Sequence, residues 1–122
     1  MKAVFVNNRG QVYLKDAPMP TLQGSGAIVE TICSIFGEGS ELGGVRRARQ
    51  ALAEGHPPAE PLSERAMSYQ SAGRIVELSD DLKGTYAIGD VVACAGGGFG
   101  HHAEYGFVGK NGMARVPEGV TA

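Results

Sequence analysis

The alternation of apolar and polar residues predicts short β-strands over most of the chain. A first hairpin is expected from strands at 2–6 and 11–17, joined by the turn-forming stretch NNRG. Residues 27–36, AIVETICSIF, form a long β-branched run that predicts a central strand. Further strands are predicted, each bounded by Gly, Asn or Pro, at 71–79, 89–96, 102–108 and 112–120.

The pattern changes after Ser40, where apolar residues recur at helical spacing: Leu42, Val45, Ala48 and Leu52. This spacing predicts one short helix near residues 41–54, with Ser40 as its N-cap and Gly55 at its end. The next segment, 56–67, contains three prolines and is predicted to be a loop. His56 in that loop has no neighbouring partner, so it is interpreted as a surface residue.

The length and glycine content narrow the fold class. The 122 residues fit one domain, and the sequence shows no internal repeat or low-complexity run. Nineteen glycines and six prolines among short β-rich runs are typical of a strand-and-turn protein. We therefore expect a mainly β domain, either a barrel or a sandwich around one core.

The charge pattern favours no nucleic-acid partner. Charged residues make up 20% of the chain and the formal net charge is −2. The basic residues are dispersed except for Arg46, Arg47 and Arg49, and a duplex-binding protein would present a broader basic face. We interpret this cluster as the solvated face of the helix.

The sequence also indicates the cellular compartment of the protein. No segment approaches the length of a membrane span, and the apolar run in MKAVFVNNRGQ is too short for a signal peptide. We expect a cytoplasmic protein with no membrane partner. Cys33 and Cys94 lie in apolar runs and are predicted to be buried free thiols, although the sequence alone leaves a pair open.

Residues 93–105, ACAGGGFGHHAEY, raise three interpretations: a metal site, a phosphate-binding loop or a turn between strands. Neighbouring residues of a strand point to opposite faces, and a helix would need a spacing of three or four, so His101 and His102 are poorly placed to share a metal. A strand, not a helix, is predicted after the glycines, so no helix N-terminus is available to hold an anion. The turn is the favoured interpretation.

Four segments in fixed order carry a resemblance to a known family: AGRIVEL (72–78), YAIGDV (86–91), HAEYGFV (102–108) and VPEGV (116–120). They resemble the GroES-like catalytic domain of medium-chain, alcohol-dehydrogenase-type oxidoreductases. In the first half, MKAVFVNN and VYLKDAPMP are similar to the family's opening hairpin, and AIVETICSIFGEGSEL is similar to the strand leading into its first helix. The resemblance implies a single GroES-like domain over 1–122, a partly open β-barrel with one or two short helices.

The chain departs from the zinc members of that family. Glu38 stands where they carry a cysteine before a Gly-Ser/Thr-acid step, and Ser68-Tyr69-Gln70 replaces their Gly-His-Glu. These groups have little affinity for Zn²⁺, and the four-cysteine structural zinc lobe has no counterpart here. We therefore expect no zinc. We also expect no NAD(P) binding by the chain alone, because no strand, Gly-rich turn and helix unit is present.

The resemblance leaves several functions open. Full-length relatives carry a Rossmann domain after the barrel, and this chain ends about where that domain would begin. Our first hypothesis is a stand-alone GroES-like module, a binding or assembly domain without independent catalysis. The alternative is the substrate-side half of a zinc-free NAD(P)-dependent oxidoreductase, completed by a Rossmann domain on another chain. A third idea is a small-ligand binder that uses the vacated cleft.

For the oxidoreductase, the resemblance implies a vacated cleft lined by five residues: Glu38, Ser40, Glu41, Tyr69 and Gln70. Ser40 matches the hydroxyl that passes the substrate proton in zinc relatives, and Glu38 or Tyr69 could transfer protons. The plainer interpretations are Ser40 as a helix N-cap, Tyr69 as a half-buried strand residue and Glu38 as a solvated charge. We predict no catalytic residue for the chain alone.

A homodimer is also expected. A chain shorter than its two-domain relatives would leave apolar surface and a strand edge uncovered. A two-fold arrangement covers both, and it is the commonest oligomer symmetry.

Overall fold

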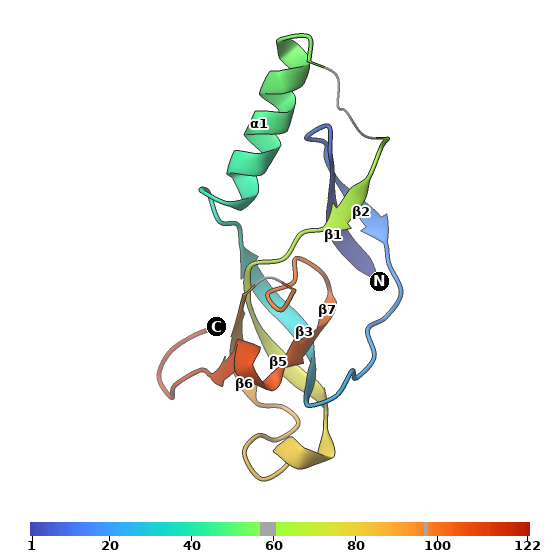
Figure 1. The fold of residues 1–122 in the computed structure, drawn as a ribbon. Coiled ribbons are helices and arrows are strands. Elements are labelled where there is room, and N and C mark those ends of the chain that lie inside the picture. The colour runs from blue at the N-terminus through green and yellow to red at the C-terminus, as the bar shows by residue number, and fades with distance from the viewer. Residues whose placement is uncertain (57–60, 97) are drawn as a thin grey trace.

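The computed structural model describes residues 1–56, 61–96 and 98–122, in which eight strands form two antiparallel sheets (Figure 1). The three-stranded sheet has the order β2-β1-β4 and contains β1 (Lys2–Asn7), β2 (Val12–Asp16) and β4 (Glu64–Ala66). The five-stranded sheet has the order β7-β3-β5-β6-β8 and contains β3 (Gly26–Ile35), β5 (Gln70–Leu78), β6 (Val91–Ala95), β7 (Tyr105–Gly109) and β8 (Met113–Arg115). The helices are α1 (Glu41–Ala53) and two short 3-10 turns, η1 (Asp80–Leu82) and η2 (Lys110–Gly112). The prediction of a mainly β fold is confirmed.

The predicted hairpin of β1 and β2 is present, with Val6 opposite Val12 across the turn. Its turn is held by Asn7, whose Oδ1 accepts hydrogen bonds from the backbone N–H groups of Arg9 and Gln11 at 3.0 and 3.1 Å. Gly10 has a φ of 74°, a conformation that few other residues adopt without strain. The NNRG stretch therefore forms the tight turn that its asparagine and glycine residues predict.

Strand β3 is central, as predicted, because it pairs with β5 on one side and β7 on the other. At Gly73 of β5 a Cβ atom would lie 2.3 Å from the carbonyl oxygen of Glu30. The backbones of β3 and β5 therefore approach closely at this glycine.

The register of β3 shifts between Thr31 and Cys33, and this shift explains a wrong prediction. Thr31 pairs with Gly73, which in turn pairs with the fully buried Val92, so this row faces the core. Without the shift, Cys33 would face the same way, because every second residue of a strand points to one face. Instead Cys33 pairs with Ala72 and is exposed.

Two clusters of apolar side chains form the core. The larger one lies inside the five-stranded sheet and consists of Ala27, Val29, Ile75, Leu78, Leu82, Val92, Cys94, Val108 and Met113. Cys94 belongs to this cluster, so its predicted burial is confirmed, and both cysteines are free thiols. The smaller cluster joins Val6, Val45 and Met67 between β1, α1 and the segment after β4.

Helix α1 begins and ends close to the predicted positions. Gly55 has a φ of 81°, and the N–H of His56 donates to the Ala51 carbonyl at 2.9 Å, which closes the C-terminus. Ser40 occupies the N-cap position, but its side chain makes no capping hydrogen bond and is exposed, so its predicted capping role is wrong. In Figure 1 the helix extends away from the five-stranded sheet.

Other element boundaries differ from those predicted. The segment 56–67 contains strand β4, because its residues 64–66 pair with β1; residues 57–60 of the predicted loop lie outside the described residues. Strand β7 begins later than predicted, because 101–103 makes only isolated bridges, Ser68 with His101 and Ala3 with Ala103. This segment thus connects the two sheets. Strand β8 covers only three residues of the predicted 112–120. No helix in the described part of the chain is long and apolar enough to cross a membrane.

Candidate functional site

The turn between β3 and α1 carries two of the five residues expected in the vacated cleft. Glu38 and Ser40 are both exposed on this turn. Tyr69 lies one residue before β5 and is 36% exposed; its ring is so close that a Cβ atom on Gly37 would lie 3.1 Å from it. The structure therefore brings Tyr69 beside the turn, which sequence spacing alone does not show.

Gln70 faces a groove rather than this turn. It is the first residue of β5 and pairs with Ile35 of β3 and Ala95 of β6. The groove has a volume of about 280 Å³ and is lined by residues 33–35, 70–72 and 93–95 together with Ala122. Its lining is rich in alanine, and Ile35 is 64% exposed beside it.

Two thiols line the groove with different chemistry. Cys33 is exposed there, whereas burial raises the pKa of the Cys94 thiol to about 11, an effect partly opposed by its hydrogen bond with Ser71. Because a thiolate is the reactive form, Cys94 is inert at neutral pH. Cys33 is the accessible thiol of this surface.

Glu41, the fifth expected cleft residue, is buried inside the molecule rather than exposed on the turn. Its carboxylate accepts from Nε2 of His102, with Oε1 and Oε2 at 3.1 and 2.9 Å. The two side chains are 6% and 1% exposed, and the Phe36 ring stacks on the imidazole with centroids 4.2 Å apart. A buried carboxylate needs such a charge-assisted partner, which explains why Glu41 turns inward.

The Glu41–His102 pair is enclosed by protein. Neither Glu41 nor His102 lines the hollows described for this part of the chain. The Nδ1 atom of His102 is buried without a hydrogen-bond partner among the described residues. The contact joins the start of α1 to the segment between the two sheets. Sequence reasoning missed it, because the residues are 61 positions apart and no local motif joins them.

The two adjacent histidines have different partners. Nε2 of His101 bonds the carbonyl oxygen of Phe107 at 2.9 Å, while His102 bonds Glu41. The prediction that they do not converge on a common site is confirmed. Within the described residues no group of three or more His, Cys, Asp and Glu side chains is placed to hold a metal ion.

The glycine run connects strands, as the turn interpretation requires. Gly96 and Gly98 have positive φ values of 108° and 88°, and the segment leads from β6 towards β7. Phe99 packs against the larger core cluster. Gly97 lies outside the described residues.

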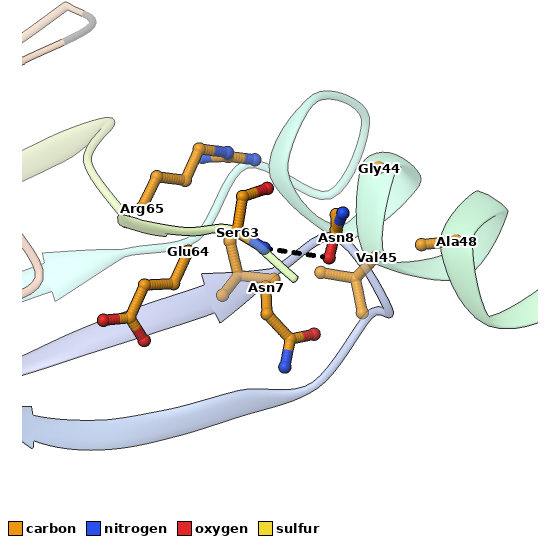
Figure 2. Close-up of a pocket in the computed structure, with 9 residues that line it drawn as sticks. Asn7, Asn8, Gly44, Val45, Ala48, Ser63, Glu64 and Arg65 are labelled. Carbon is orange, nitrogen blue, oxygen red and sulfur yellow. Dashed lines mark hydrogen bonds between the residues drawn. The ribbon is translucent and has the colours of Figure 1, made fainter. Parts of the chain in front are cut away.

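A second hollow of about 210 Å³ lies between the end of β1, helix α1 and β4 (Figure 2). At its rim the Ser63 N–H donates to Oδ1 of Asn8 at 3.3 Å, and the Asn8 amide donates to the Pro61 carbonyl. The side chains of Glu64 and Arg65 point to opposite sides of the chain in Figure 2, and Glu64 bonds Tyr13 and Lys15 outside the hollow. Both asparagines that line the hollow, Asn7 and Asn8, are already hydrogen-bonded within the chain.

Comparison with known proteins shows the fold alone. No protein-family model matches the chain, and no curated protein matches it. Among solved structures it is similar to the native structure of mycobacterial Rv1454c complexed with NADPH, with a TM-score of 0.68 and 17% sequence identity. The similarity covers 99% of this chain and 35% of Rv1454c, so this chain spans about a third of that protein's length.

Proposed function

We propose that this chain is a GroES-like domain of the medium-chain, alcohol-dehydrogenase type that contributes the substrate side of a zinc-free, NADPH-dependent oxidoreductase and has no catalysis of its own. The observation that carries the proposal is the similarity of almost the whole chain to one third of a protein solved with NADPH. The ordered family segments in the sequence agree with it. Hydride transfer needs a cofactor held against a substrate, and this domain supplies one side of such a site.

The groove across β3, β5 and β6 is the surface on which we expect a small substrate to lie. It is largely apolar, which suits a ligand pocket, and Gln70 offers an amide that can orient a carbonyl oxygen. Tyr69 directly precedes Gln70, and Glu38 lies on the turn between β3 and α1. The partner that brings NADPH is a Rossmann domain, either on another chain or on a continuation of this one.

The inward turn of Glu41 favours a second candidate function. With Glu41 bound to His102, the expected cleft loses one of its acidic groups, and Glu38 and Ser40 are exposed. A binding or assembly module, in which this domain takes no part in catalysis, also fits this arrangement.

A domain replacement separates the two functions. Residues 1–122 would replace the matching third of Rv1454c, and NADPH binding and NADPH oxidation would be measured with a panel of small carbonyl acceptors. The substrate-side function predicts that the chimera binds and oxidises NADPH, and that Gln70→Ala lowers kcat/KM by about tenfold while Glu64→Ala does not. A folded chimera that binds NADPH and turns over no acceptor accepted by Rv1454c would favour the assembly module.

The isolated chain gives an independent test. Calorimetric titration is expected to show no binding of NADH, NAD, NADPH or NADP, whereas micromolar binding of any of them would contradict the proposal. The expected homodimer is tested by sedimentation equilibrium at micromolar concentration; a mass of one chain across the whole range would exclude it.

A further inference from the structure

The hollow of about 210 Å³ between β1, α1 and β4 collects positive charge from separate parts of the chain. Arg65 of β4 lines it directly. Arg47 of α1 folds back over the first turns of its own helix: a Cβ atom on Gly43 would lie 3.3 Å from its Nη1, and one on Gly44 would lie 3.9 Å from its Nη2. Because Gly44 lines the hollow, the Arg47 guanidinium lies at the edge of this hollow.

A third guanidinium reaches the same hollow from the turn between β1 and β2. Nη1 of Arg9 donates to Oδ1 of Asn8 at 3.0 Å, and that oxygen also accepts from the Ser63 N–H at the rim. Asn8 and Ser63 both line the hollow. Three arginines, Arg9, Arg47 and Arg65, are therefore brought to one hollow from a turn, a helix and a strand.

The positive charge at the hollow has no recorded counter-charge. Within the described parts of the chain, none of the three arginines forms an ion pair with a carboxylate. Glu64 also lines the hollow, but its carboxylate is paired with Lys15 and accepts from the Tyr13 hydroxyl. The whole chain has a net charge of −2, so a basic surface is not general to this protein. Like charges gathered in this way repel one another, and a bound anion relieves the repulsion.

The hollow also offers a neutral hydrogen-bond donor and apolar atoms. In Figure 2 the Arg65 guanidinium and the Ser63 hydroxyl lie on the same side of the chain, opposite the Glu64 carboxylate. A hydroxyl can donate to an anionic oxygen beside the guanidinium. The rest of the lining includes three apolar side chains: Val6, Val45 and Ala48. A ligand with several oxygens and a short carbon body would therefore find matching groups within this hollow.

We propose that this hollow binds the phosphoryl group of a small phosphomonoester, held by Arg47 and Arg65, with Arg9 adding positive charge at the rim. A guanidinium binds phosphate oxygens through a fork of two hydrogen bonds, which makes arginine a strong phosphate ligand. A phosphomonoester carries about 1.5 to 2 negative charges at neutral pH. It therefore matches three cations better than a single carboxylate does.

The size of the hollow limits the ligand. Its volume of about 210 Å³ is below the roughly 300–1,000 Å³ of pockets for drug-sized molecules, so a phosphoryl group with a few carbon atoms suits it best. The hollow shares no lining residue with the groove across β3, β5 and β6. The inference therefore goes beyond the proposed function and does not depend on it.

Proton–nitrogen NMR correlation spectra of the whole chain, recorded during a titration, test the site. The probes are inorganic phosphate and glycerol phosphate, with glycerol and sodium acetate as controls, all at constant ionic strength. We expect both phosphates to shift the amide signals of Asn8, Gly44, Ala48 and Ser63, with dissociation constants below about 1 mM. Glycerol should shift none of these signals, and acetate should bind at least about tenfold more weakly than either phosphate.

Three results of the titration would overturn the proposal. The first is no saturable shift with glycerol phosphate, including the case in which inorganic phosphate alone binds. The second is a set of shifts spread equally over distant arginines such as Arg74 and Arg115, which would indicate unspecific attraction of anions. The third is equal binding of acetate, which would show that the hollow does not select a phosphoryl group.

Two variants show whether the arginines carry the binding. Arg65→Gln and Arg47→Gln should each raise the dissociation constant of glycerol phosphate at least about tenfold, because each removes a charge-assisted hydrogen bond. Both side chains are exposed, so the variants should fold, and unchanged amide signals from β5 (Gln70–Leu78) would verify this. Arg74→Gln is the matched control: it changes the net charge equally, does not line the hollow and should bind as the wild type. An equal loss in Arg74→Gln, or unchanged binding in either hollow variant, would overturn the site.

Discussion

The carboxylate of Glu41 and the imidazole of His102 meet inside the protein across 61 positions of sequence, with Nε2 2.9 Å from Oε2. The contact joins the first turn of α1 to the segment between the two sheets. It also turns Glu41 away from the surface on which the family resemblance predicts a cleft. The Glu41–His102 contact, the close approach at Gly73, the two cysteines and the contacts of Asp90 each lead to a testable prediction.

Breaking the pair should be costly and non-additive. Glu41→Ala and His102→Ala are each expected to lower the free energy of unfolding by about 3 kcal/mol, because each leaves a buried polar partner unmatched. The double variant should cost less than the sum, since the second change removes the group that the first left unpaired. Urea unfolding followed by circular dichroism measures all three. Additive costs would show that the residues do not interact, and the exposed Glu38→Ala should change stability by less than about 0.5 kcal/mol.

Gly73 should not tolerate a side chain. In Gly73→Ala the new methyl group would meet the Glu30 carbonyl oxygen at 2.3 Å and Cγ1 of Val29 at 2.5 Å, so two central strands must separate. We expect a loss of about 3 kcal/mol in the free energy of unfolding. Gly84→Ala is the matched control, because no heavy atom lies within 4 Å of its added Cβ. Thermal melts compare the melting temperatures of the two variants. Equal melting temperatures would argue against the tight contact of β3 and β5.

The two thiols should differ in reactivity. Cys33 is exposed, whereas Cys94 is buried with its pKa raised to about 11. A maleimide reagent should therefore modify one thiol per chain in the native protein and both in denaturant, as measured by mass spectrometry. Cys33→Ser should abolish the native reaction and Cys94→Ser should leave it unchanged. Rapid native labelling of Cys94 would contradict the packing of the larger core cluster.

Asp90 should contribute stability that depends on pH. Its Oδ2 accepts from Arg115 and from the Ala87 N–H at 2.8 and 2.9 Å, and these contacts, Arg115 foremost, hold the pKa of the Asp90 carboxyl below its usual range. A lowered folded-state pKa stabilises the protein above the ordinary carboxyl range, and this contribution is lost as pH falls through the lowered value. Asp90→Asn should therefore lower the melting temperature at neutral pH, with the difference from wild type shrinking in acid.

A matched substitution separates this local effect from a change in overall charge. Asp80 carries the same charge and contacts Lys83, but its side chain is 94% exposed. Asp80→Asn should leave the melting temperature nearly unchanged at every pH, because exposed ion pairs contribute little. Differential scanning calorimetry over a pH series compares the two variants. A pH-independent loss in Asp90→Asn would indicate that shape, not charge, makes Asp90 important.

Local patterns in the sequence determined most of the secondary structure. The alternation in 27–36 predicts β3, the turn residues at 7–10 predict the first hairpin, and Gly55 marks the end of α1, because each depends on residues a few positions apart. The adjacency of His101 and His102 sufficed to predict that they do not share a site. In each case the physical constraint acts within one strand, turn or helix.

The tertiary structure alone decided the exposure of Cys33, the strand at 64–66 and the position of Glu41. A register shift in β3 changes which face Cys33 occupies, and such a shift depends on the partner strand rather than on the sequence of β3. Strand β4 exists only because β1 offers it an edge to pair with. The family resemblance placed Glu41 in a cleft, but in the folded chain its carboxylate bonds His102, on whose ring Phe36 stacks. Pairing between distant segments, which no local pattern encodes, determined all three.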